Sequence, residues 1–172
     1  VVDQSPVRSD GTAKDALNET VDLAIAAESL GYRRYWVAEH HNLANFAGTS
    51  PEIMVGQIAS RTNTIRVGSG GVMLPHYSAL KVAENFRMLE TLFPGRIDLG
   101  IGRAPGSDQI TAAALAYPRV PIDINHYPQQ VKDVMSFLGD THANEHMFNS
   151  VFAGPGQFTI CLLYTSATAQ ER

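Results

Sequence analysis

Short apolar runs in this chain alternate with segments whose apolar residues recur every three or four positions. The runs at 34–38, 65–74 and 97–101 are rich in aromatic or β-branched residues, which predicts buried strands. Residues 1–2 resemble the end of a further strand whose beginning is missing. Helical spacing predicts helices from about 13 to 30, 51 to 61, 78 to 93, 107 to 117 and 127 to 138. Regular alternation of strand and helix predicts an α/β fold with a parallel sheet and right-handed crossovers.

Local signals set the helix ends. Thr12 and Asp15, three positions apart, predict a capping box, and Gly31 is placed to end the first helix in the left-handed conformation. Pro51 stands at the first position of the second helix, where a missing N–H costs nothing. Ser107 is expected to cap a short helix whose alanines suit close packing.

Composition restricts the partners. The chain has 172 residues, 44% of them hydrophobic and 17% charged, as in an ordinary globular domain. The net charge of −4 argues against nucleic acid, which needs a clustered basic face. No apolar run approaches the roughly 20 residues of a membrane span. The single cysteine, Cys161, fits a reducing compartment, and we expect a cytoplasmic protein.

The last twelve residues differ from the rest. The hexapeptide 161–166 is what one reading frame of a common transposon-type sequencing adapter encodes, although its composition also suits a strand. We therefore expect one barrel-type domain over residues 1–160 and a non-native tail over 161–172. With four strands before the tail and two open sheet edges, the isolated chain is expected to be unstable, dimeric or aggregated.

Reactive side chains follow the first long strand. Because parallel strands end on one face of a sheet, groups at these ends can surround one ligand. Glu39 precedes His40 and His41, and an imidazole can exchange a proton near neutral pH. A metal site lacks supporting ligand spacing, so none is expected. The alternative is a strand-end histidine bonded to the backbone.

The second strand carries Gly68, Gly70 and Gly71, which indicate a bulge or the close approach of a flat ligand. Tight packing between strands is the alternative. Trp36 is expected in the core, and His76 on a loop or surface.

The third strand leads into Arg103, which can hold a phosphate together with the helix start at Ser107. The alternative is an ion pair between Arg103 and Asp98 or Asp108.

Three segments together resemble the luciferase-like flavin monooxygenases: YWVAEHHN at 35–42, RVGSGGVMLP at 66–75 and GRIDLGIGRAPG at 95–106. DQSP at 3–6 is similar to the family's first strand and loop. The resemblance implies a TIM-type (β/α)8 barrel, truncated here to about its first four βα units, since a full barrel takes about 250 residues.

The resemblance further implies a monooxygenase that uses reduced FMN and O2 to oxygenate a small organic substrate. It assigns His40 as catalytic, Glu39 to the same pocket, the Gly70–Gly71 step to a non-proline cis peptide under the flavin ring, and Arg103 to the flavin phosphate. A separate flavin reductase and a homodimer are expected for the full-length protein. Two alternatives stay open: a deazaflavin (F420)-dependent oxidoreductase on the same barrel, and a non-catalytic flavin-binding protein.

Overall fold

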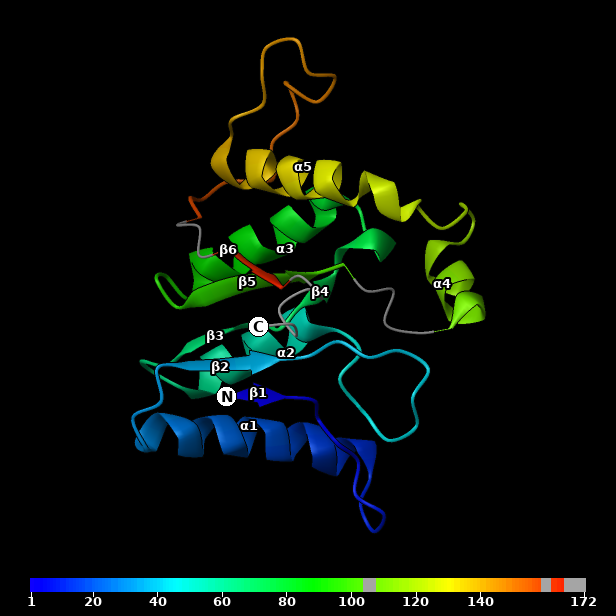
Figure 1. The fold of residues 1–172 in the computed structure, drawn as a ribbon. Coiled ribbons are helices and arrows are strands. Elements are labelled where there is room, and N and C mark those ends of the chain that lie inside the picture. Colours follow the sequence, from blue (N-terminus) through cyan, green and yellow to red (C-terminus); the bar gives the residue numbers. More distant parts are fainter. Residues whose placement is uncertain (104–107, 159–161, 166–172) are drawn as a thin grey trace, which may run out of the picture.

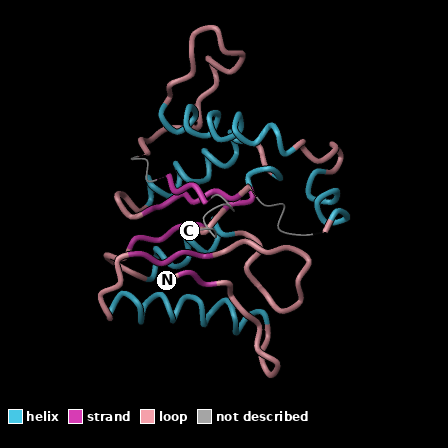
Figure 2. Tube along the Cα trace, in the orientation of Figure 1, coloured by secondary structure: helices cyan, strands magenta, loops and turns pink. Residues whose placement is uncertain are grey.

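The computed structural model describes residues 1–103 and 108–158, and the backbone of 162–165. Strands lie at the centre and helices lie around them (Figure 1), an arrangement that the tube view repeats (Figure 2). The strands are β1 (Val2–Asp3), β2 (Arg34–Val37), β3 (Arg66–Ser69), β4 (Val72–Met73), β5 (Ile97–Gly102) and β6 (Leu162–Thr165). The helices are α1 (Ala13–Ser29), α2 (Pro51–Arg61), α3 (Ala79–Leu92), α4 (Gln109–Ala116) and α5 (Tyr127–Gly139), with 3₁₀ turns η1 (Leu74–His76) and η2 (Ile124–His126). None of the described helices is both long enough and apolar enough to cross a membrane.

Each strand pair in the described sheet is parallel, as predicted. The order is β1-β2-β3-β5-β4, and β6 lies beside β5. Consecutive strands β1, β2 and β3 are joined by helices, which is the connection that a parallel pair requires. The carboxyl ends of β2, β4 and β5 therefore lie at the same edge of the sheet. The pairing of β6 leaves the proposed non-native origin of residues 161–172 untested.

The glycine-rich segment is two strands rather than the single strand predicted. Val67 pairs with Ile97, an offset of 30 residues, whereas Val72 pairs with Ile101, an offset of 29. One additional residue is therefore accommodated on the β3–β4 side, as in a bulge. The Gly70–Gly71 peptide between the two strands is cis.

The helix ends follow the sequence signals closely. Thr12 and Asp15 form the reciprocal capping box, and Gly31 has φ +79°. Pro51 begins α2 as expected. The N-cap of α4 is Asp108, whose carboxylate accepts from the N–H groups of Ile110 and Thr111; Ser107, the predicted cap, lies outside the described residues. No residue of α4 is buried, so the close packing expected of its alanines is absent.

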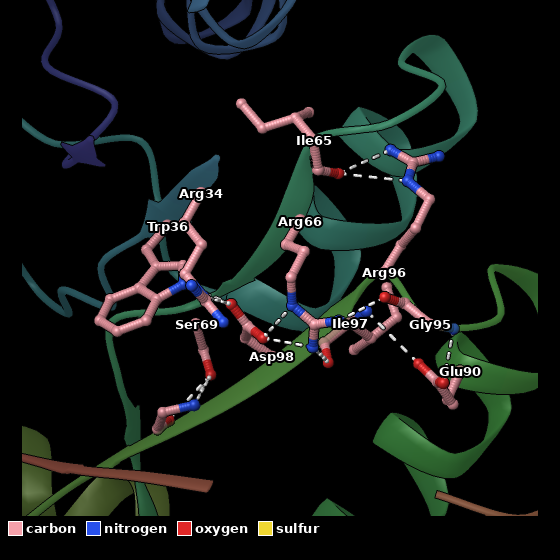
Figure 3. Close-up of polar contacts among 11 residues, drawn as sticks. Arg34, Trp36, Ile65, Arg66, Ser69, Glu90, Gly95, Arg96, Ile97 and Asp98 are labelled. Atoms are coloured by element: carbon pink, nitrogen blue, oxygen red, sulfur yellow. Dashed lines mark hydrogen bonds and ion pairs between the residues drawn. The ribbon is translucent and has the colours of Figure 1, made fainter. Parts of the chain in front are cut away.

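The two faces of the sheet differ in chemistry. Alternate residues of β2, β3 and β5 point toward the helices and form the core with them. The strand residues of this core include Tyr35, Val37, Val67, Ile97, Leu99 and Ile101, and the helix residues include Ile58 and Phe86. The opposite face carries Arg34, Trp36, Arg66 and Asp98 (Figure 3). Trp36 is thus only partly buried, and its assignment to the core was wrong because its position alternates with Tyr35 and Val37.

Candidate functional site

Three strand ends converge as the sequence predicted. The N–H of Met73 in β4 donates to Oε2 of Glu39, which follows β2, over 2.9 Å. Met73 is also the register partner of Gly102, the last residue of β5. Arg103 comes directly after Gly102, so residues from three segments far apart in sequence border one edge of the sheet.

Glu39 is the centre of this edge. Its side chain is fully buried, and a buried carboxylate must be satisfied by donors. Oε1 accepts from the Tyr77 hydroxyl over 2.6 Å and lies 2.7 Å from Nε2 of His41. Together with the Met73 N–H, these groups give both carboxylate oxygens a hydrogen-bond partner.

Burial raises the pKa of the Tyr77 phenol well above its ordinary value, and the hydrogen bond to Glu39 and the charge of that carboxylate raise it further. Tyr77 therefore keeps its proton at neutral pH and acts only as a donor to Glu39. Its main chain is fixed as well, because its N–H donates to the Leu74 carbonyl and its carbonyl accepts from Gln130.

His40 lies beside this network without joining it. The His40 ring stacks on Phe46 at a centroid distance of 4.7 Å, and the main-chain N–H of His40 donates to the carbonyl of Gly48. Nε2 of His40 is buried and has no hydrogen-bond partner among the described residues. Buried polar atoms in proteins normally have a hydrogen-bond partner, so Nε2 is placed to bond to a group outside the described residues, such as a bound organic molecule. The residues therefore fit a ligand at this edge.

Close packing accounts for the glycine pair. A Cβ on Gly71 would lie 2.9 Å from the carbonyl oxygen of Gly100 in β5. A Cβ on Gly70 would lie 3.2 Å from that of Trp36. The tight packing considered as an alternative is thus present, and a ligand contact at these two residues stays a prediction. The Gly70–Gly71 peptide is cis, as the resemblance implied.

Arg103 is exposed at the end of β5. Neither carboxylate of the proposed ion pairs holds it in the described residues. Asp98 binds Arg34 and Arg66, while Asp108 caps α4 and accepts from Nδ2 of Asn42 over 3.1 Å. Hydrogen bonds from Thr111 and Asn42 lower the pKa of Asp108 to about 2. The Asn42 contact brings the start of α4 to the loop after His41.

Sequence reasoning did not select His41, and it left Tyr77 open between pocket lining and packing. It put His76 on a loop or the surface, whereas His76 is only 9% exposed. Its ring lies 6.5 Å from that of His41. No local signal selects His41, because β2 ends at Val37 and residues 39–41 lie beyond its alternation. In the described parts of the chain, no three His, Cys, Asp or Glu side chains are placed to hold a metal ion.

Comparison with known proteins identifies the relatives of this arrangement. The chain is 54% identical to the uncharacterised protein YwcH of Bacillus subtilis and 44% identical to the N-acetyl-S-alkylcysteine monooxygenase of that organism, over 90% of its length in each case. It spans about half of these relatives, 46% of each. The crystal structure of apo-MsnO8 superposes with a TM-score of 0.83 at 41% identity, over 96% of this chain and 49% of that one.

More distant structures share the fold alone. The oxygenating constituent of a 3,6-diketocamphane monooxygenase from Pseudomonas putida, solved with FMN, has a TM-score of 0.70 at 19% identity, covering 84% of this chain and 41% of that one. An F420-dependent secondary alcohol dehydrogenase has a TM-score of 0.64 at 19% identity, covering 90% of this chain and 48% of that one. These are TIM-barrel proteins, which confirms the predicted fold class, with this chain about half their length. The luciferase-like monooxygenase family description matches residues 1–134, most of the chain. The chain therefore belongs to the luciferase-like monooxygenase family.

Proposed function

We propose that this chain is the N-terminal part of a flavin-dependent monooxygenase, in which reduced FMN and O2 oxygenate a small organic substrate. The observation that carries the proposal is Nε2 of His40, buried and without a partner among the described residues, beside the satisfied Glu39 carboxylate at the edge where β2, β4 and β5 end. Parallel α/β proteins bind ligands at this edge. Relatives named monooxygenases, at 44% identity, support oxygenation over hydride transfer.

Each residue has a definite part in the proposal. His40 contacts the bound ligand through Nε2, and Glu39 holds the neighbouring groups in place. The backbone of Gly70 and Gly71 faces the flat ring. Arg103, exposed beyond β5, binds the flavin phosphate through bidentate hydrogen bonds from its guanidinium group. Bound FMN supplies the redox chemistry with O2. A separate reductase delivers it in reduced form, and the full-length protein is a homodimer.

Oxygen uptake tests the proposal directly. Reduced FMN and reduced F420 are each added, with candidate organic substrates, to the full-length protein of which this chain is the N-terminal part, and oxygen consumption and product are measured. We expect product only with reduced FMN, and His40→Ala to lower turnover by about 10²-fold, the scale of a positioned acid–base group. His126→Ala, at an exposed histidine of η2, is the matched control. Substrate turnover with F420 alone would refute the proposal.

Flavin titration tests the phosphate contact separately. Arg103→Ala is expected to weaken FMN binding by about 10-fold or more, because charge-assisted hydrogen bonds to a phosphate are lost. Arg119→Ala, at another exposed arginine, is expected to leave binding unchanged. Equal FMN affinity in the two variants would remove Arg103 from the site.

A further inference from the structure

Two donors compete for one oxygen of Glu39. The Tyr77 hydroxyl and Nε2 of His41 both lie within 2.7 Å of Oε1, while the Met73 N–H occupies Oε2. An ionised carboxylate only accepts hydrogen bonds, so each neighbour must present a proton to it. Tyr77 Oη and His41 Nε2 are also 3.3 Å apart, but each lies closer to Oε1 of Glu39 than to the other.

This arrangement determines the tautomer of His41. Nε2 carries the proton that Glu39 accepts, so Nδ1 is the ring nitrogen left to accept a proton from elsewhere. The His41 side chain is 11% exposed and cannot turn freely without giving up its bond to a buried carboxylate. His40, by contrast, makes no hydrogen bond to Glu39 in the described residues and is held by stacking on Phe46.

Tyr77 is placed to control this bond. It follows η1, the turn that leaves the glycine-rich segment, and its main chain is tied to Leu74 and to Gln130 of α5. The phenol thus reaches Glu39 from a fixed backbone rather than from a mobile loop. Glu39 and Tyr77 are 38 residues apart, so only the fold brings them together.

We propose that Tyr77 is a positioning residue: by sharing Oε1 of Glu39 with His41, it fixes His41 with its proton on Nε2 and with Nδ1 as the proton-accepting nitrogen. The inference rests on the proposed function for its catalytic meaning. It makes His41 a second acid–base group of the site, next to His40, the proposed ligand contact. The geometry itself can be tested without flavin.

Proton and nitrogen NMR of the full-length protein labelled with 15N-histidine tests this geometry. We expect His41, assigned with the His41→Asn variant, to show a downfield, slowly exchanging Nε2 proton and an unprotonated Nδ1. Tyr77→Phe should move that proton further downfield, because Oε1 then serves a single donor. Glu39→Gln should accelerate its exchange with water at least 10-fold.

Tyr35→Phe is the matched control. Tyr35 is also buried and donates to a carboxylate, Oδ2 of Asp3, over 2.6 Å, but lies outside the Glu39 network. It should leave the His41 signals in place. A proton on Nδ1 in the unaltered chain, or equal His41 signals in Tyr77→Phe and Tyr35→Phe, would overturn the proposal. The unaltered chain alone decides the tautomer, so failure of a variant to fold leaves the proposal testable.

Oxygen uptake by the full-length protein with reduced FMN then separates the two ideas. If Tyr77 positions the site, Tyr77→Phe lowers turnover about 10-fold with little change in the flavin concentration needed for half-maximal rate. Uptake that is absent in every variant, with the NMR result as expected, refutes the monooxygenase function and leaves the positioning intact. Normal turnover in Tyr77→Phe overturns the positioning role and leaves the function standing.

Discussion

Replacing Asp98 by asparagine tests the polar face of the sheet. The Asp98 side chain in β5 is fully buried and accepts four hydrogen bonds from described residues (Figure 3). Oδ2 accepts from Nε of Arg34 and Nε1 of Trp36, both at 3.0 Å. Oδ1 accepts from Nε and one terminal nitrogen of Arg66, at 2.8 and 2.5 Å. Asparagine keeps the shape but has one acceptor oxygen, so its NH2 must face donors on one side.

The cost follows from this mismatch. Breaking a buried ion pair by removing one partner costs about 3–5 kcal/mol. The Arg34 side chain is 45% exposed and that of Arg66 is 27% exposed, so water compensates both guanidinium groups in part. We therefore expect Asp98→Asn to lower the free energy of unfolding by about 2–3 kcal/mol.

Urea unfolding followed by circular dichroism, at two protein concentrations, measures the loss. Glu84→Gln is the control, because Glu84 and Lys81 form an exposed pair within one turn of α3, at 3.1 Å. Such a pair contributes less than about 0.5 kcal/mol. Equal losses in the two variants would mean that the Asp98 cluster is no more than a surface interaction, and the reasoning would fail.

Two further changes probe the frame of the sheet. Burial raises the pKa of Glu28, but hydrogen bonds from the N–H groups of Ile65, Thr64 and Asn63 outweigh it and lower the value to about 2. The ionised form of Glu28 therefore adds stability above about pH 4.5 that is lost as the pH falls toward 2. In Glu28→Gln, the urea concentration at the unfolding midpoint should depend less on pH over that range. Gly68→Ala would place a Cβ 2.6 Å from that of Asp98 and against its carbonyl oxygen, so it should leave less folded protein than Gly11→Ala, where the nearest atom is 3.7 Å away. Comparable yields and thermal midpoints for the two alanine variants would contradict that packing.

Local pattern was sufficient for most of the framework. The capping box at Thr12, the glycine at the end of α1 and the proline at the start of α2 depend on neighbours in sequence, and each was predictable. The division of the 65–74 run was not, because the bulge appears only in the register of β3 and β4 against β5.

The site shows the same limit. β2 ends at Val37, so strand alternation no longer decides which way residues 39–41 point. The choice between His40 and His41 depends on where the Glu39 carboxylate lies, and that is set by Met73 and Tyr77, more than 30 residues away. Contacts at such separation leave no local trace in the sequence.

The close approach of β5 to Gly71 has a consequence for protein engineering. A side chain at that position would collide with main chain, which cannot move aside without breaking the sheet. A library built to alter ligand preference therefore gains nothing from randomising the glycine pair. Diversity is better directed to an exposed position after His41 such as Leu43, which is 45% exposed.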